Sequence, residues 1–270
     1  AALASPREGL TTLLYGEDAL PEGSPLPKQS VLLREAGYGM LRSPQVTVAA
    51  RFGIHGSGHG HPDKLNILTY GAGRMMGVDP GSINYGVPLF FQWYKATISH
   101  NTVSVDQTQQ TRADAHVTGW QANAEGTVLA GESEPYPGVK FRRTLRLAGN
   151  VLDDRFDCES ATEHTYDWAF HSQGLLETSL EMKRRREPIA TVSGYQHIKQ
   201  VSEAATDGDW TAKWTEGDAV LELKVKGAPG TTVCMGKGPG PDPAHDVWLI
   251  LIRRKGAAAS FEVTHTYRKA

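Results

Sequence analysis

The sequence predicts an all-β protein built as a large antiparallel β-sandwich. Short runs rich in β-branched and aromatic residues recur about every ten residues from Ser30 onward, separated by Gly, Pro, Asp and Asn. No amphipathic stretch of helical period has a convincing length. The 270 residues, of which 39% are hydrophobic, are enough to bury a substantial core.

Three segments are expected along the chain. Residues 1–27 are predicted to be a linker or tail, because several prolines interrupt any regular element there. Residues 28–180 are predicted to form the main sandwich, which carries the candidate site. Residues 181–270 either continue this sandwich or form a smaller C-terminal sheet domain. The first residues lack a basic segment followed by an apolar one, so no signal peptide is expected.

The first strands form a consecutive series. Residues 30–34 and 38–42 flank Ala36-Gly37, a pattern that predicts a hairpin. Residues 45–51 alternate in part between apolar and polar, which predicts a half-buried strand that leads into a histidine-rich turn. Residues 64–70 are predicted to resume as the next strand.

The rest of the chain continues this pattern. Residues 107–124 are polar and lack a period, so we expect them to be irregular. The further strand candidates share β-rich composition and turn residues at their ends: 126–132, 138–148, 150–158, 164–171, 188–193, 197–203, 209–214, 219–226, 230–235, 246–254 and 259–267.

Charge and cysteine content narrow the choice of partners. The formal net charge of −2 gives no reason to propose nucleic acid, and no apolar run is long enough to span a bilayer. Basic residues cluster at Arg142-Arg143 and at 183–186, which indicates solvated faces or places beside an acidic polymer. Cys158 and Cys234 are too few for a disulfide framework. A periplasmic or secreted location is only slightly favoured.

A histidine-rich run between residues 53 and 63 is the most informative feature of the sequence. It places His55, His59, His61 and Asp63 close together, separated mainly by Gly and Ser. Glycine permits unusual backbone conformations and close approach of a ligand, and such a cluster suits metal binding or proton handling. The alternative interpretation is a solvated loop.

Three further pieces follow this run. They are Asp79 in a Pro-Gly turn, Tyr85 beside a glycine, and Trp93-Tyr94 followed by His100 at the start of a strand. Two His and one Asp are the ligand types of a zinc site with an open position. On spacing alone, an Asp in such a turn is more often a turn residue, and a His before a strand is more often a core histidine.

Taken together, these motifs resemble the heparinase II/III-like polysaccharide lyase family. The resemblance lies in Gly58–Leu65, in Asp79–Gly81 with Tyr85-Gly86, and in Trp93-Tyr94 with Ser99–Thr102, and it covers about residues 30–106. The family joins an N-terminal helical (α/α) toroid to a C-terminal antiparallel β-sandwich. Only the second part is resembled here, and the toroid normally supplies a catalytic tyrosine and an Asn or His that binds the substrate carboxylate.

The resemblance implies roles for particular residues. His59 would be the active-site histidine of the sandwich. Beside it, Tyr85 is a candidate catalytic residue and His55 and Tyr94 are candidate substrate contacts. The alternatives are a loop residue for His55 and half-buried packing for the two tyrosines. A structural zinc ion would be bound by three residues: His61, Asp79 and His100. The partners would be an acidic polysaccharide or oligosaccharide and a helical toroid domain or chain that this sequence lacks.

The expected function is therefore the β-sandwich portion of a lyase that cleaves uronate-containing glycans, of the alginate or glycosaminoglycan type, by β-elimination. One alternative is a uronate C5-epimerase, which would use the same proton abstraction and return the proton to the opposite face. Another is a carbohydrate-binding sandwich without catalytic activity, which would bind acidic sugar and never turn it over.

Overall fold

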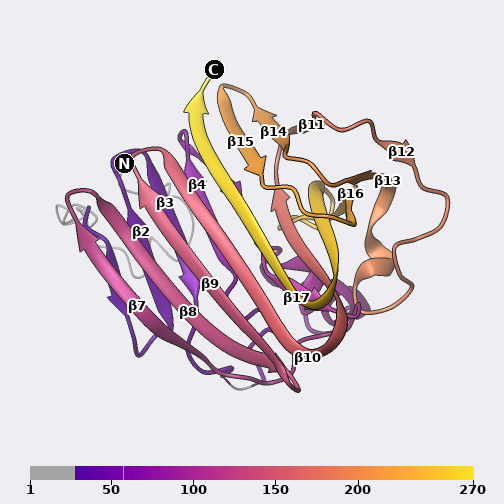
Figure 1. Cartoon of the computed structure of the whole chain (residues 1–270), viewed down its shortest axis with the longest axis horizontal. Helices are drawn as coiled ribbons and strands as arrows, with labels where there is room; N and C mark the ends of the chain where they lie inside the picture. The colour runs from indigo at the N-terminus through magenta and orange to yellow at the C-terminus, as the bar shows by residue number, and fades with distance from the viewer. Residues whose placement is uncertain (1–27, 57) are drawn as a thin grey trace, which may run out of the picture.

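The computed structural model describes residues 28–56 and 58–270, which form two antiparallel sheets (Figure 1). The expectations of an N-terminal tail and of no signal peptide fall on residues 1–27 and lie outside the described residues. The smaller sheet has five strands in sequence order: β1 (Val31–Leu33), β2 (Tyr38–Arg42), β3 (Val46–Arg51), β4 (Ile67–Gly71) and β5 (Arg74–Gly77). The all-β prediction is confirmed.

The larger sheet has twelve strands and is built around two long neighbours. They are β10 (Val151–Ser172) and β17 (Asp246–Lys269), which pair antiparallel along most of their length. On one side of β10 follow β9 (Val139–Ala148), β8 (Gly126–Tyr136) and β7 (Ala115–Asn123). The other strands are β6 (Val103–Val105), β11 (Leu175–Thr178), β12 (Lys183–Arg184), β13 (Lys199–Thr206), β14 (Trp210–Glu216), β15 (Ala219–Val225) and β16 (Thr231–Pro239).

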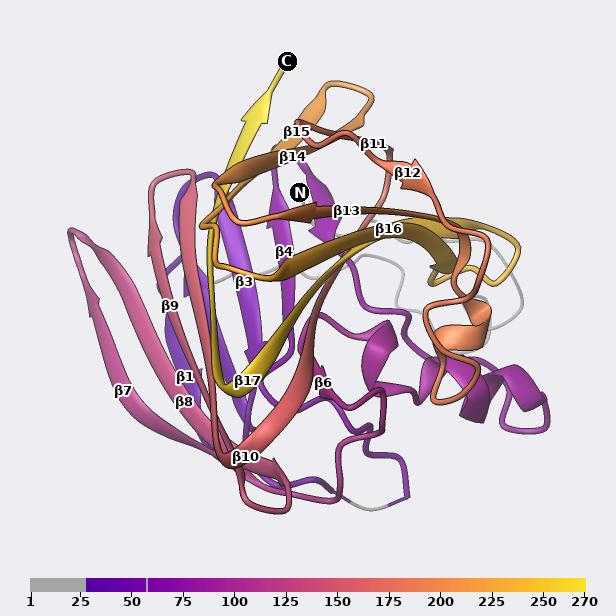
Figure 2. The ribbon, with the colours of Figure 1, turned by 45° about the vertical axis from the view of Figure 1, so that its right-hand side comes forward.

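The two sheets pack face to face because their strands alternate between buried and exposed residues. Strands β3 and β9 show this period of two over their whole length, as an antiparallel sheet with one wet face requires. Figure 2 shows the purple strands β3 and β4 behind β9 and β10. The main core lies between them and includes Val48 and Ile67 of the smaller sheet and Leu145, Phe156 and Trp168 of the larger one.

Several strand predictions differ from the structure. Residues 115–123, predicted to be irregular, form β7, which pairs with β8 at an edge of the larger sheet and has mostly exposed side chains. No strand forms at 188–193, where Ser193 and Gly194 both have positive φ and turn the chain. The candidates on either side of residues 159–164 belong to one strand, β10, which continues across a register shift.

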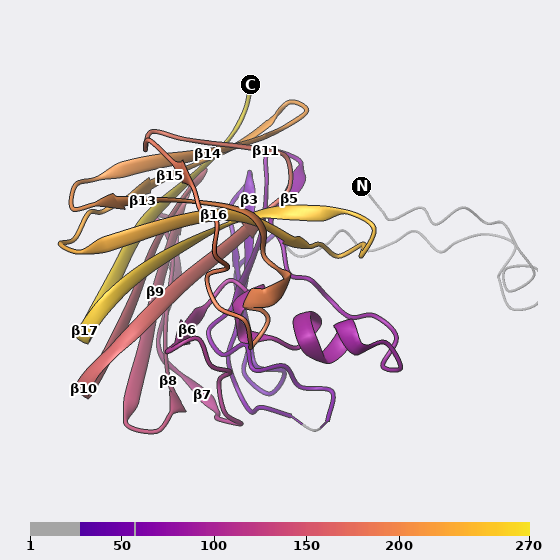
Figure 3. The ribbon, with the colours of Figure 1, turned by 90° about the vertical axis from the view of Figure 1, so that its right-hand side faces the viewer.

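Three short helical turns lie at one end of the sandwich and position the candidate site. They are η1 (Phe90–Tyr94), η2 (Thr97–Ser99) and η3 (Tyr195–His197). Figure 3 shows η1 and η3 close together, and both contribute to a second hydrophobic cluster with Phe90, Trp93, Ile98 and Tyr195. In the described part of the chain, no helix has the length and hydropathy needed to cross a membrane.

Candidate active site

The histidine-rich loop connects β3 to β4, and backbone contacts hold it at both ends. Gly53 exchanges two backbone hydrogen bonds with Ala115, at 2.8 and 2.9 Å. Near its tip, a side chain at Gly60 would place its Cβ only 2.1 Å from the His55 carbonyl oxygen. The glycine therefore allows the loop to fold back on itself. Lys95 donates to the Gly58 carbonyl oxygen at 2.8 Å, directly before His59.

His59 and Tyr85 meet at this loop although 26 positions separate them. The Nδ1 atom of His59 lies 2.8 Å from the Tyr85 hydroxyl oxygen, and the imidazole tautomer decides which group donates. Both side chains are exposed, Tyr85 to 53%. The Tyr85 ring is fixed edge-on against Phe90 of η1, with ring centroids 4.5 Å apart. Phe90 therefore fixes the position of the pair, and the exposed side chains of His59 and Tyr85 are accessible to a substrate.

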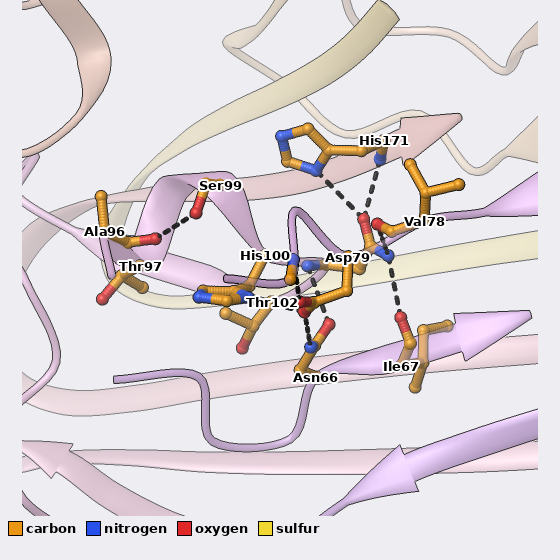
Figure 4. A network of polar contacts seen from close by, with 12 residues as sticks. Asn66, Ile67, Val78, Asp79, Ala96, Thr97, Ser99, His100, Thr102 and His171 are labelled. Atoms are coloured by element: carbon orange, nitrogen blue, oxygen red, sulfur yellow. Dashed lines mark hydrogen bonds and ion pairs between the residues drawn. The ribbon is translucent and has the colours of Figure 1, made fainter. Parts of the chain in front are cut away.

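His100 and Asp79 form a second pair beneath the loop, shown in Figure 4. The Nδ1 atom of His100 donates to Asp79 Oδ2 at 2.7 Å, and Asp79 also accepts from Asn66 Nδ2 at 2.7 Å and from the Gly81 backbone at 2.9 Å. Burial disfavours both charged forms, but their mutual attraction prevails. This attraction raises the pKa of His100 and holds the pKa of Asp79 well below its usual range.

His61 lies beside this pair. Its ring centroid is 5.3 Å from that of His100 and 6.4 Å from that of Phe90. Burial, and then the positive charge of His100, lower the pKa of His61 to about 4, so its imidazole is neutral at neutral pH. The Nε2 atom of His100 is buried and has no hydrogen-bond partner among the described residues. The His61 and His100 rings therefore lie close together, but His61 forms no hydrogen bond with His100 Nε2.

Asn101 connects the strands around this pair, and the sequence patterns did not single it out. Its Nδ2 donates to the carbonyl oxygens of Ile67 and Val78, at 2.8 and 3.0 Å. Its Oδ1 accepts from the His171 backbone at 2.8 Å and lies 3.1 Å from His171 Nδ1. Its backbone N–H donates to Asn66 Oδ1, and Asn66 in turn contacts Asp79. One buried amide therefore fixes β4, the turn before Asp79 and β10 relative to His100.

Arg143, on strand β9 of the larger sheet, supports the segments around His100 through hydrogen bonds. It forms a double hydrogen bond with Asp154, at 2.8 and 2.5 Å, and both side chains are at most 2% exposed. Its Nη1 donates at 2.6 Å to the carbonyl oxygens of both Leu65 and Asn101. The expectation of an exposed face for Arg143 is wrong. The signal was present, because Arg143 shares the alternate positions of Phe141 and Leu145 on the buried face.

The two predicted substrate contacts lie in different surroundings. His55 is half-buried on the loop; its backbone N–H donates to Asp114 at 2.9 Å, and burial, followed by the charge of Lys64, lowers the pKa of its ring. Tyr94 is 0% exposed, and its hydroxyl donates to the Gly240 carbonyl oxygen at 2.9 Å. Its ring packs in the second cluster. Tyr94 therefore does not line the opening of the site.

The buried His171 predicts a loss of stability in acid. Burial lowers the pKa of His171 to about 3, so between about pH 6.5 and 3 the unfolded chain binds a proton that the native chain does not. Stability must therefore fall as pH falls through this window, by about 2 kcal/mol from this one group between pH 7 and 5. In His171→Gln, urea unfolding at several pH values is expected to show a shallower dependence. Identical slopes for the two proteins would contradict this.

Comparison with known proteins identifies the family of this chain. Residues 25–229 match the family described as heparinase II/III-like, C-terminal. The chain is 30% identical over 174 residues to an alginate lyase of Stenotrophomonas maltophilia, covering 54% of this chain and 24% of that protein. It is 25% identical over 292 aligned residues to an exo-oligoalginate lyase of Saccharophagus degradans, covering 94% of this chain and 39% of that protein.

Solved structures agree on the fold. A heparan sulfate lyase from Pedobacter heparinus superposes with a TM-score of 0.71 at 14% identity, over 96% of this chain and 39% of that one. A putative mutarotase from Salmonella typhimurium superposes with a TM-score of 0.54 at 9% identity, over 93% of this chain and 97% of that one. The chain thus spans less than half the length of the three lyases named here. Because the family match covers most of its residues, the chain belongs to the heparinase II/III-like, C-terminal family.

Proposed function

We propose that the chain is the β-sandwich portion of a polysaccharide lyase that acts on uronate glycans of the alginate type. The observation that carries the proposal is the His59–Tyr85 contact of 2.8 Å, exposed at the end of a sandwich of this family. The curated relatives named as alginate lyases favour alginate among the acidic glycans. We further propose that turnover requires a helical toroid domain or chain, which together with the sandwich makes up the complete enzyme.

The reaction would be a β-elimination. A base removes the proton at C5, next to the carboxylate, the C4–O bond breaks, and a C4–C5 double bond forms while the leaving oxygen takes up a proton. His59 and Tyr85 would move these protons, because imidazole and phenol joined by one hydrogen bond can each give or receive one. Hydrogen-bonding and positive groups must also stabilise the charge that develops on the carboxylate.

A zinc ion bound by His61, Asp79 and His100 forms part of this proposal. No three metal-ligating side chains converge within residues 28–56 and 58–270, but the unpartnered His100 Nε2 and the neighbouring His61 ring fit as ligands. Hydrogen bonds from His100 and Asn66 hold the Asp79 carboxylate beside the His100 ring. When bound, the ion would supply a fixed positive charge. Its ligands would join the histidine-rich loop to the strand that follows His100.

Zinc content can be measured on the isolated chain. We expect about one zinc ion per chain by elemental analysis and an earlier melting transition after chelation, because metal bound to the native state adds stability. His61→Ala is expected to lose the metal, while His245→Ala, at an exposed site, should keep it. A wild-type chain without metal after refolding in zinc would refute the zinc proposal and leave the His59–Tyr85 pair untouched.

The lyase proposal is tested by its product. The complete enzyme, incubated with alginate, is expected to produce the ultraviolet absorbance of an unsaturated uronate. Exchange of the C5 proton with solvent without that absorbance would indicate an epimerase instead. Binding of alginate with neither absorbance nor exchange would indicate a carbohydrate-binding sandwich.

A further inference from the structure

A basic edge lies on the short strand β12 and just beyond it; we define it as Lys183, Arg184 and Arg186. All three side chains are exposed. Among the strands that the structure describes, β12 pairs with β13 alone, so it ends its part of the sheet. The side chains of residues 184–186 surround a surface hollow. In a chain with net charge −2, this is a local concentration of positive charge.

The basic edge differs from the basic residues on the exposed face of β9 in having no acidic partners. On the exposed face of β9, Lys140, Arg142 and Arg146 each lie within 4.0 Å of a carboxylate on a neighbouring strand. Within the described residues, no carboxylate forms an ion pair with any member of the basic edge, and only the intervening Arg185 has one, with Glu203. The guanidinium and ammonium groups of the basic edge are therefore available to an anionic ligand.

The segment that follows the basic edge packs against residues that support the candidate active site. Ile189, three residues after Arg186, packs in the same cluster as Phe90, and Phe90 supports Tyr85. A Cβ on Gly194 would lie 2.6 Å from that of Ala96, so this segment runs directly against the turns that precede His100. Figures 2 and 3 show η3 beside η1, with β12 leading away from both.

We propose that the basic edge is an accessory subsite for the carboxylates of an acidic glycan chain, remote from the bond that is cleaved. This inference rests on the proposed function. A polyuronate carries a carboxylate on every sugar, and the planar guanidinium of arginine matches a carboxylate with two parallel hydrogen bonds. Arg184 ends the strand and Arg186 lies two positions beyond it, and both side chains are exposed, so one glycan chain can contact two guanidinium groups here.

The test is binding of long alginate oligosaccharides to the isolated chain, measured by calorimetry at two salt concentrations. Arg184→Gln/Arg186→Gln is expected to weaken binding at least tenfold at low salt and to reduce the salt dependence, because exposed charges are screened. The control Lys140→Gln/Arg142→Gln makes the same change in net charge at residues that already have acidic partners. Its affinity is expected to stay within about twofold of wild type.

Three results would overturn the subsite: no binding by the wild-type chain, equal losses in the two double variants, or unchanged binding with new self-association of the Arg184→Gln/Arg186→Gln protein. The last would show that the charges protect a sheet edge instead. In the complete enzyme, the same variant should raise KM for polymer and leave kcat unchanged. Loss of turnover in every complete enzyme, wild type included, would refute the lyase and not the subsite, because binding is measured separately.

Discussion

Arg143→Met is expected to lower the free energy of unfolding by about 3–5 kcal/mol, the usual cost of removing one partner of a buried ion pair. The substitution leaves Asp154 buried without its cation and removes the donor that serves the carbonyl oxygens of Leu65 and Asn101. Burial raises the pKa of Asp154, but Arg143 prevails and holds that pKa at about 2. Without Arg143 the carboxyl would take up a proton, so the deficit relative to wild type should shrink in acid.

Urea unfolding of two variants tests this account. Arg142→Met, one position away, removes an exposed guanidinium 3.6 Å from Glu132 and is expected to cost about 0.5 kcal/mol or less. Arg143→Met/Asp154→Leu should recover part of the loss, because no buried charge is left alone. Equal stability of Arg142→Met and Arg143→Met would mean that the buried pair contributes nothing.

His59→Ala is expected to lower kcat of the complete enzyme by about 10²- to 10⁴-fold, the range for a positioned proton-transfer group. The side chain is exposed, so the melting temperature should stay close to that of wild type. His116→Ala, at another exposed histidine, is the matched control and should retain wild-type turnover. Wild-type turnover by His59→Ala would remove His59 from the mechanism.

Much of the fold could be predicted from the sequence because strand patterns are local. Alternation and turn residues located β2, β3, β9 and β15 within a few residues. Strand β7 was missed, since an edge strand with exposed side chains has no apolar period. The strand predicted at 188–193 failed because the chain there turns through left-handed backbone at Ser193 and Gly194, and Ile189 packs against the helical turns.

The sequence indicated the titratable residues of the candidate site but not the residues that hold them in place. The His-Gly repeat marked the loop, and the structure brings His59 to Tyr85 and His61 to the Asp79–His100 pair. Asn101 and Arg143 act through contacts between segments distant in sequence. The alternation of β9 indicates that Arg143 is buried, but no local pattern identifies the groups that either residue contacts. For Tyr94 the sequence left substrate contact and packing both open, and tertiary packing buries the side chain.

The most direct test of the central claim compares kcat for His59→Ala, Tyr85→Phe and the double variant in the complete enzyme acting on alginate. If His59 and Tyr85 move protons as one unit through their 2.8 Å contact, the double variant will lose about as much activity as the worse single variant. Losses that multiply would show that the two residues act independently. Wild-type turnover in all three would contradict the assignment of this site.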